Sequence, residues 1–306
     1  MVNTVINSVV SLFLIMVVGV YGSKKGIITS DVNNGLINIL LNIALPLMVI
    51  SSFMFSFDES IKNNIVKAFF YSLFTYFLLI GISYLLVHPI KGEKKTIIHF
   101  SNIFTNTGYI GFPVLHTIYG PEGVVYGSIF NMFFVLFLWT YGVVLFKGHM
   151  EYEELKKEAL KTIRNPSIVA VIIGVLIMLL NINIPEILFN SIKSIGNITG
   201  PLSMIIVGVI ISNVEFNTHL KDWALYYGIV TKLIILPMIL YLIAGLINDR
   251  SIVANSVIII ASMPAASMTS IFAVRYSKEK DFATIIVLIT TILSIITIPI
   301  LVKILI

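Results

Sequence analysis

Long apolar stretches and short polar islands alternate along the whole chain. Each stretch holds roughly 20 predominantly apolar residues, the length at which an α-helix crosses about 30 Å of hydrocarbon. Ten such stretches divide the 306 residues into units of about 30 residues, so about 10 residues remain for each connection, too few for an extramembrane domain. The pattern predicts ten spans, at residues 3–21, 32–55, 64–87, 96–118, 122–146, 166–183, 187–212, 223–246, 251–272 and 282–305.

The longest polar island divides the chain into two five-span halves. The halves cover residues 1–147 and 166–306, and the island between them, 148–165, is expected to be a cytoplasmic connector. Glu153 and Glu154 precede Lys157 at helical spacing, which favours a short helix in this connector. Because each half has an odd number of spans, related halves must have opposite orientations in the membrane.

Composition and charge place this all-α chain in a membrane and orient it. Hydrophobic residues make up 58% of the chain and charged residues 11%, whereas a soluble domain carries about a quarter charged residues. Fourteen of the 20 Lys and Arg residues fall in connections on one face and four in those on the other. The positive-inside rule then puts the N-terminus and the C-terminus outside the cytoplasm, and no nucleic-acid partner is needed to explain the basic residues. The expected location is the cytoplasmic membrane, as a multi-pass protein.

An internal repeat connects the second and seventh spans. The second span contains NILLNIALPL from Asn38, and the seventh contains KSIGNITGPL from Lys193. A shift of 155 residues aligns four identical positions, namely Asn42, Ile43, Pro46 and Leu47 with Asn197, Ile198, Pro201 and Leu202. Polar residues in the second span also step by four, at Asn34, Asn38 and Asn42, which places them on one helix face. The match predicts two inverted five-helix repeats.

The fourth and ninth spans contain residues that interrupt a helix. The fourth reads IFTNTGYIGFPVLH, in which Asn106 to Pro113 weaken the middle of the span. The ninth has Pro264 among small polar residues that include Ser267. A broken helix leaves backbone groups unpaired in hydrocarbon unless protein or a water-filled cavity receives them, so interruptions at corresponding positions of two halves predict a central transport site. The alternative is a proline kink with small residues that allow close helix packing.

A single lysine, Lys232, lies close to the middle of the eighth span. A buried ammonium is costly there, and all 15 acidic residues sit at span ends or in connections, so the sequence offers it no carboxylate within the membrane. We hypothesise that Lys232 faces the cavity and either counters an anionic substrate or donates to broken-helix carbonyls; a snorkelling or packing lysine is the alternative.

The absence of acidic residues within the spans also favours uniport or exchange over transport coupled through a carboxylate. No metal site or cofactor is expected.

At these interruptions the chain resembles the auxin efflux carrier family, bacterial and plant carriers that include the plant PIN auxin exporters. The resemblance covers the whole chain and rests on NTGYIGFPV (106–114), on MPAASMTSIFAVRY (263–276), on the Leu-Pro of the second span and on the ten-span layout. It implies two inverted five-helix repeats, a scaffold of spans 1, 2, 6 and 7, and a moving transport domain of spans 3–5 and 8–10. Spans 4 and 9 break and cross at the binding site in this family, whose members form homodimers through the scaffold.

The family's motif residues transfer to this chain with two departures. The asparagine after the first break corresponds to Asn106, and the proline of the second repeat corresponds to Pro264. Many plant members have proline where this chain has Thr105, so the first break is expected to rest on Gly108 and Gly111. A polar residue often follows the second proline, where this chain has Ala265.

The predicted site suits a carboxylate. Half-helix N-termini carry a partial positive charge and free N–H groups, and neutral donors such as Asn106 and Thr107 orient an anion without a second buried charge. The expected substrate-binding residues are Asn42, Asn106, Thr107, Gly108, Asn131, Lys232, Pro264, Ala265 and Ser267. The expected helix-break residues are Thr105, Gly111, Pro113 and Pro264.

These features predict a secondary transporter that moves small organic anions by elevator-type alternating access. The family resemblance implies auxin-like acids or small carboxylates such as malate or malonate. A sodium-coupled organic anion symporter of the bile-acid-transporter type and a passive channel or sensor remain as alternatives. A membrane-embedded enzyme is not expected, because the spans hold no paired aspartates, no His/Glu metal cluster and no serine with an adjacent base.

Overall fold

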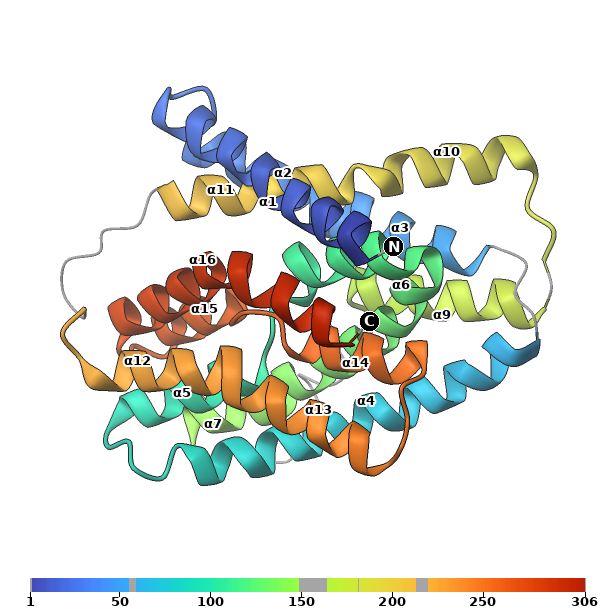
Figure 1. The fold of residues 1–306 in the computed structure, drawn as a ribbon. Coiled ribbons are helices and arrows are strands. Elements are labelled where there is room, and N and C mark those ends of the chain that lie inside the picture. The colour runs from blue at the N-terminus through green and yellow to red at the C-terminus, as the bar shows by residue number, and fades with distance from the viewer. Residues whose placement is uncertain (1, 55–58, 149–163, 181, 213–219, 306) are drawn as a thin grey trace.

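The computed structural model describes residues 2–54, 59–148, 164–180, 182–212 and 220–305, and this part of the chain is all-helical (Figure 1). Within these described residues, six helical stretches are long and apolar enough to cross a membrane: Ser30–Phe53, Asn63–Leu86, Thr107–Lys147, Glu186–Ser212, Trp223–Leu246 and Lys280–Leu305. Three shorter apolar helices, Ser11–Lys24, Pro166–Leu179 and Ile252–Ala261, accompany them. The chain is therefore a helical, multi-pass membrane protein, as its composition predicts.

The stretches are built from consecutive helical elements. In the first half these are α1 (Val2–Lys24), α2 (Ser30–Ile39), η1 (Leu40–Ala44), α3 (Leu45–Phe53), α4 (Glu59–Leu86), α5 (Glu93–Ile103), η2 (Thr107–Gly111), α6 (Phe112–Phe137), η3 (Leu138–Gly142) and α7 (Val143–Lys147). In the second half they are α9 (Pro166–Leu179), α10 (Glu186–Asn197), α11 (Thr199–Ser212), α12 (Trp223–Val230), η4 (Thr231–Ile235), α13 (Leu236–Leu246), α14 (Ile252–Ala261), α15 (Met268–Arg275) and α16 (Lys280–Leu305).

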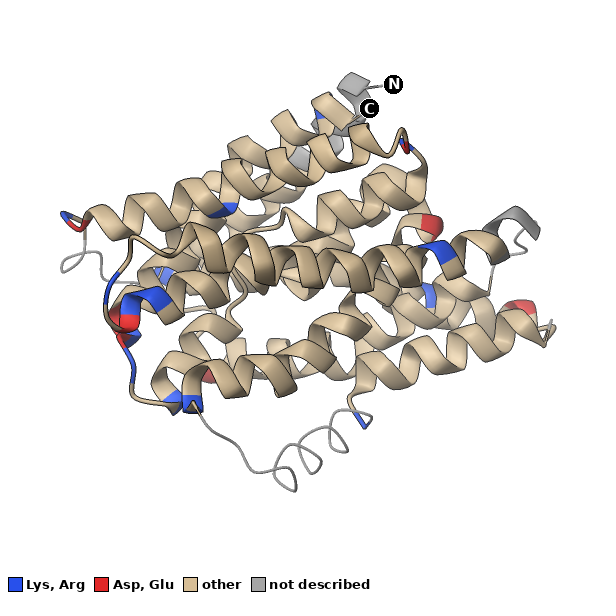
Figure 2. Cartoon of the chain, turned by 90° about the horizontal axis from the view of Figure 1, so that it is seen from below, with Lys and Arg blue, Asp and Glu red and all other residues tan. Residues whose placement is uncertain are grey.

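Charged side chains gather near the two ends of the molecule. Figure 2 shows that the lengths of helix between these ends are almost entirely free of Lys, Arg, Asp and Glu. The distribution matches the predicted polar islands and is what a protein surrounded by hydrocarbon requires, because a charge at the bilayer centre is costly.

One continuous helical stretch, Thr107–Lys147, covers the region where two spans were predicted. Gly120 divides it, since its backbone (φ 61°, ψ −146°) is not helical and Pro121 follows directly. Only glycine adopts this conformation without strain, so the connection predicted at this point is a sharp kink. Of the predicted connector, residues 149–163 lie outside the described part of the chain.

Three π-helical turns come directly before prolines, and the sequence patterns did not predict them. The turns η1, η2 and η4 end shortly before Pro46, Pro113 and Pro237. Proline has no N–H and its ring crowds the carbonyl four residues earlier, so a wider turn relieves the clash. Each wide turn rotates the side chains that follow it relative to an ideal α-helix.

Glycines allow α1 and α11 to cross in backbone contact. A Cβ added to Gly208 would lie 2.0 Å from the carbonyl oxygen of Met16, and one added to Gly19 would lie 2.1 Å from that of Ile205. No real side chain tolerates such distances. The pair therefore packs through small residues, as membrane helices commonly do where no hydrophobic effect drives them together.

Candidate functional site at two interrupted helices

Two helix interruptions meet in the interior of the protein. The first separates α5 from η2, and the second separates α14 from α15. Thr105 and Ala265 form an antiparallel β-bridge between them. The N–H of Asn106 donates to the carbonyl oxygen of Pro264 at 2.8 Å, and the N–H of Ala266 donates to that of Phe104 at 3.0 Å. Each interruption thus pairs backbone groups that the other leaves free, which a break inside a membrane requires.

The interruption in the first half includes the predicted Thr105 but does not rest on Gly108 and Gly111. It covers Phe104, Thr105 and Asn106, whereas Gly108 and Gly111 lie in the π-helical turn that follows and Pro113 lies in α6. Asn106 fixes this position because its side-chain oxygen accepts the N–H of Tyr109 at 3.1 Å and so caps the new helix. Gly111 instead permits close packing, since a Cβ there would lie 3.1 Å from Cγ1 of Ile260.

Pro264 and Ala265 support the crossing from inside and do not face a cavity. Both residues are buried. The carbonyl oxygen of Pro264 is engaged by Asn106, and the N–H of Ala265 donates to Oγ1 of Thr290 on α16 at 3.3 Å. Thr290 therefore supplies the polar group that Ala265 itself lacks.

A cavity of about 490 Å³ lies against the crossing, a size typical of small-molecule sites. Six of the predicted residues line it: Thr105, Asn106, Thr107, Gly108, Asn131 and Ser267. A second cavity, of about 220 Å³, shares Asn106, Ile210, Ser267 and Ile271 with the first and extends between α11, α15 and α16. Asn106 and Ser267 are the polar residues that line both cavities.

Two asparagine side chains in the larger cavity are fixed by hydrogen bonds that their Oδ1 atoms accept. Oδ1 of Asn106 accepts the N–H of Tyr109, and Oδ1 of Asn131 accepts the hydroxyl of Thr107 at 2.6 Å. Both asparagines are buried, with 5% and 6% of their surface exposed. An amide whose oxygen is engaged in this way has its NH₂ group left to donate. The cavity therefore has two fixed amide donors beside the first turn of a helix, where backbone N–H groups lack helical partners.

Residues outside the predicted binding set complete the cavity wall. Asn34, Asn165 and Ser167 add polar groups, and Tyr109, Phe134 and Trp139 add aromatic ones. Trp139 is partly exposed and packs against Phe272, with ring centroids 5.7 Å apart. The helical spacing of Asn34, Ile37, Leu41 and Leu45, all of which line the cavity, is the signal that could have identified this face of the second span.

Asn42 does not join the site. It lies in the π-helical turn η1, its side chain is exposed, and its Nδ2 donates to the carbonyl oxygen of Asn38 at 3.0 Å. The sequence prediction placed Asn42 on one face with Asn34 and Asn38 by assuming a regular α-helix. The π-helical turn rotates Asn42 away from the crossing.

Lys232 is buried close to the crossing but does not line either cavity. Only 1% of its surface is exposed, and its Nζ donates to the backbone carbonyl oxygen of Asn102 at 3.0 Å. Asn102 is in the last turn of α5, where carbonyl groups have no helical partner and the helix carries a partial negative charge. Of the two roles hypothesised for this lysine, the geometry matches donation to a broken helix and not contact with a substrate.

A buried hydrogen-bonded cluster surrounds this lysine. Oδ1 of Asn102 accepts from Thr231 at 3.3 Å, and Nδ2 of Asn102 donates to Ser83 at 3.1 Å. Ser83 also contacts Nδ1 of His99, whose Nε2 lies 2.8 Å from the hydroxyl of Tyr141. The cluster joins α4, α5, η3 and η4 and holds the end of α5 in place.

No charged side chain lines the larger cavity in the part of the chain that the structure describes. Among the same residues no group of three or more His, Cys, Asp or Glu could hold a metal ion. The polarity of the cavity therefore comes from amides, hydroxyls and backbone N–H groups. Such a lining suits an anion that accepts hydrogen bonds, because it supplies donors without the desolvation of a fixed cation.

Comparisons with known proteins agree with this architecture. The family described as "Membrane transport protein" matches residues 4–302 of the chain. An uncharacterized transporter of Methanocaldococcus jannaschii is 23% identical over 306 residues, with 95% of each chain covered. An uncharacterized transporter of Methanothermobacter thermautotrophicus is 24% identical over 298 residues, again with 95% of each chain covered.

Proposed function

This chain belongs to the membrane transport protein family, the family of the auxin efflux carriers, and on that basis we propose that it is a secondary transporter of small organic anions. This family is one of transporters and not of enzymes. The substrate binds in the 490 Å³ cavity at the crossing of the interrupted helices, and elevator-type alternating access carries it across the cytoplasmic membrane.

The observation that carries this proposal is the pair of anchored amides. Asn106 and Asn131 have their oxygens engaged by Tyr109 and Thr107, which leaves their NH₂ groups for a ligand. A carboxylate has only acceptor atoms, so it can take both donors together with a backbone N–H at Gly108. Hydrogen bonds to a charged group are worth about 1.5–3 kcal/mol each, enough to replace part of the lost hydration.

The remaining lining favours an acid with one carboxylate and an apolar body. Phe134, Trp139 and Leu138 form an apolar and aromatic wall beside the amides. A second carboxylate would lose its hydration on entering the cavity, where no cationic side chain among the described residues lines the wall to pair with it, and burying such an unpaired charge is costly. We therefore favour aromatic or aliphatic monocarboxylates over malate-like dicarboxylates.

The proposed mechanism uses the predicted two-domain architecture. Ten spans form two inverted repeats, in which spans 3–5 and 8–10 carry the site past a scaffold of spans 1, 2, 6 and 7, and the scaffold joins two copies into a homodimer. Both termini lie outside the cytoplasm. The two cavities that share Asn106 and Ser267 support this arrangement, since a site walled on both sides by the same residues can be opened alternately.

A thermal-shift screen of the purified protein tests the proposal. Monocarboxylates with an apolar body, such as indole-3-acetate and benzoate, are expected to raise the melting temperature, because a ligand at 100 times its Kd stabilises the folded state by about 2.7 kcal/mol. Malonate is expected to give a smaller shift. The shift is expected to disappear in Asn106→Ala and to persist in Asn190→Ala, which changes an exposed asparagine on α10.

The same screen separates the alternatives. If sodium alone raises the melting temperature, or if carboxylates act only when sodium is present, the sodium-coupled symporter is the better account. A panel in which no organic anion has an effect would contradict the proposal.

A further inference from the structure

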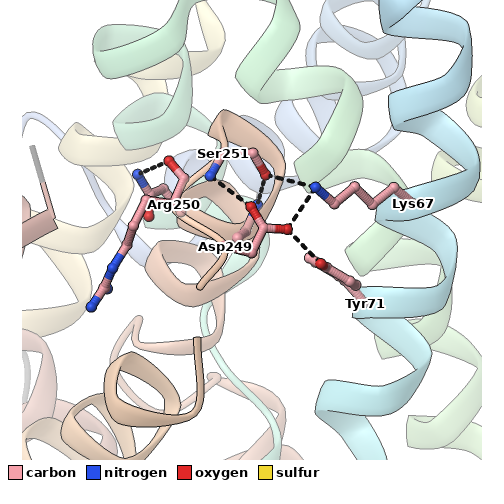
Figure 3. A network of polar contacts seen from close by, with 7 residues as sticks. Lys67, Tyr71, Asp249, Arg250 and Ser251 are labelled. Atoms are coloured by element: carbon pink, nitrogen blue, oxygen red, sulfur yellow. Dashed lines mark hydrogen bonds and ion pairs between the residues drawn. The ribbon is translucent and has the colours of Figure 1, made fainter. Parts of the chain in front are cut away.

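Two lysine–aspartate ion pairs join helices that are far apart in the sequence. Nζ of Lys67 on α4 lies 2.6 Å from Oδ2 of Asp249, which follows α13. Nζ of Lys94, in the first turn of α5, lies 2.6 Å from Oδ2 of Asp222, which precedes α12. We call them the Lys67–Asp249 clasp, drawn in Figure 3, and the Lys94–Asp222 clasp.

The two clasps hold their carboxylates in the same way. Oδ1 of Asp249 accepts the N–H of Ser251 at 2.8 Å, and Oδ1 of Asp222 accepts the N–H of Ala224 at 3.0 Å. In both, the backbone donor lies two residues after the aspartate and bonds to Oδ1, while Oδ2 contacts the lysine. The backbone hydrogen bond therefore holds each carboxylate with Oδ2 toward the lysine.

Two tyrosine hydroxyls also link the halves of the chain, one of them at the Lys67–Asp249 clasp. The hydroxyl of Tyr71 on α4 donates to Oδ2 of Asp249, as Figure 3 shows. The hydroxyl of Tyr227 on α12 donates to the carbonyl oxygen of Leu86, at the end of α4, at 2.6 Å. Both hydroxyls connect an element of residues 1–147 with one of residues 166–306.

The aspartates are well shielded from solvent. Their side chains are 14% exposed at Asp249 and 18% at Asp222, against 36% and 29% for the lysines. Burial raises the pKa of Asp249, but hydrogen bonds from Lys67, Tyr71 and Ser251 outweigh it and hold that pKa well below its usual range. The hydrogen bond to Asp222 raises the pKa of Lys94. Both clasps therefore stay ionised at neutral pH.

The clasps correspond to each other through the internal repeat. Lys67 shifted by 155 residues is Asp222, because 222 − 67 = 155, and Lys94 shifted by 155 is Asp249, because 249 − 94 = 155. The same shift aligns Pro46 with Pro201. Each clasp thus maps onto the other with its charges exchanged, and in both the lysine comes from the first half of the chain.

The correspondence places the clasps at opposite ends of the protein. Leu86, which accepts from Tyr227 five residues after Asp222, follows Lys67 by 19 steps along α4, and at 1.5 Å per step this is roughly 28 Å. That length is close to the thickness of the hydrocarbon layer. One clasp therefore lies at each face of the membrane, with the crossing between them.

We propose that both clasps stay closed throughout the transport cycle and fasten the moving helices of the two halves into one body. The inference rests on the proposed function. The physical reason is the crossing: if the halves slid past each other, the bonds between Asn106 and Pro264 and between Ala266 and Phe104 would open inside hydrocarbon. A clasp at each face prevents that, whereas contacts with the scaffold must break.

Cysteine cross-linking tests this directly, because the natural chain has no cysteine. The double variants Lys67→Cys/Asp249→Cys and Lys94→Cys/Asp222→Cys are reconstituted into proteoliposomes, and uptake of radiolabelled indole-3-acetate is measured before and after treatment with a short bis-methanethiosulfonate reagent. Loss of the ion pair is expected to slow uptake about two- to tenfold, and the cross-link is expected to restore it.

A cross-link between the proposed moving body and the scaffold serves as the control. A Cβ added to Gly200 on α11 would lie 3.9 Å from Cβ of Pro113 on α6, a distance suited to a disulfide. Oxidised Gly200→Cys/Pro113→Cys is expected to lose uptake at least tenfold, and reduction is expected to recover it. If cross-linking either clasp stops uptake, the clasps open during the cycle and the inference is wrong.

Nitroxide labels on the same cysteine pairs give a measurement that needs no substrate. Distances across each clasp are expected to form one narrow population in lipid, whereas distances across the Gly200/Pro113 boundary are expected to form two. Two populations across a clasp contradict the inference. If wild-type protein transports no carboxylate, the proposed function fails, and the label distances still decide whether the clasps stay closed.

Discussion

Replacing Asn106 with alanine is expected to weaken carboxylate binding roughly 10- to 100-fold, because it removes a hydrogen bond to a charged group worth about 1.5–3 kcal/mol. The same change deletes the cap that accepts the N–H of Tyr109, which costs about 1 kcal/mol of stability. Titration of indole-3-acetate by calorimetry measures the first effect, and thermal unfolding measures the second.

A second variant separates the donor from the cap. Asn106→Asp keeps the oxygen that accepts from Tyr109 but replaces the NH₂ donor with a second acceptor. Stability is expected to stay near that of the wild type, while carboxylate binding is expected to be lost through repulsion. Normal affinity in Asn106→Asp would show that the amide of Asn106 does not contact the substrate.

Replacing Lys232 with methionine is expected to lower the maximal transport rate while leaving carboxylate affinity close to normal. The substitution leaves the carbonyl of Asn102 without its donor, at a cost of about 1–3 kcal/mol that corresponds to roughly 5- to 150-fold in rate if the crossing is disturbed. Affinity is spared because Lys232 lines neither cavity. Separate determination of KM and the maximal uptake rate in proteoliposomes measures both quantities.

Chemical rescue distinguishes this positioning role from a general packing defect. In Lys232→Ala, added methylammonium is expected to restore part of the rate by donating to the vacated carbonyl of Asn102. Lys232→Arg is expected to be impaired, because the planar guanidinium does not fit a site built around a compact ammonium. A large rise in KM with an unchanged maximal rate in Lys232→Met would instead indicate direct contact with the substrate.

Apolar length and the interrupting residues were enough to predict the helical membrane fold and the two interruptions that pair in its interior. Thr105, Asn106 and Pro264 lie at the crossing because a break in hydrocarbon needs a partner, and that requirement can be read from one sequence. The expectation for Gly108 and Gly111 was wrong because the Asn106 cap begins a new helix before them.

Other features depend on geometry that a sequence pattern does not contain. The turn before Pro46 rotates Asn42 outward, and Trp139 packs against Phe272 and lines the cavity. The partner of Lys232 is a backbone carbonyl, which carries no residue-specific signal. The two clasps join residues more than 120 positions apart, so they became visible only once the helices were placed.

The central claim is that the amide-lined cavity carries an organic monocarboxylate across the membrane. Uptake of radiolabelled indole-3-acetate into sodium-free proteoliposomes tests it most directly, with and without unlabelled acid trapped inside. We expect saturable uptake that trapped acid accelerates and that Asn106→Asp abolishes. Uptake that requires sodium, that does not saturate or that Asn106→Asp leaves unchanged would contradict the account.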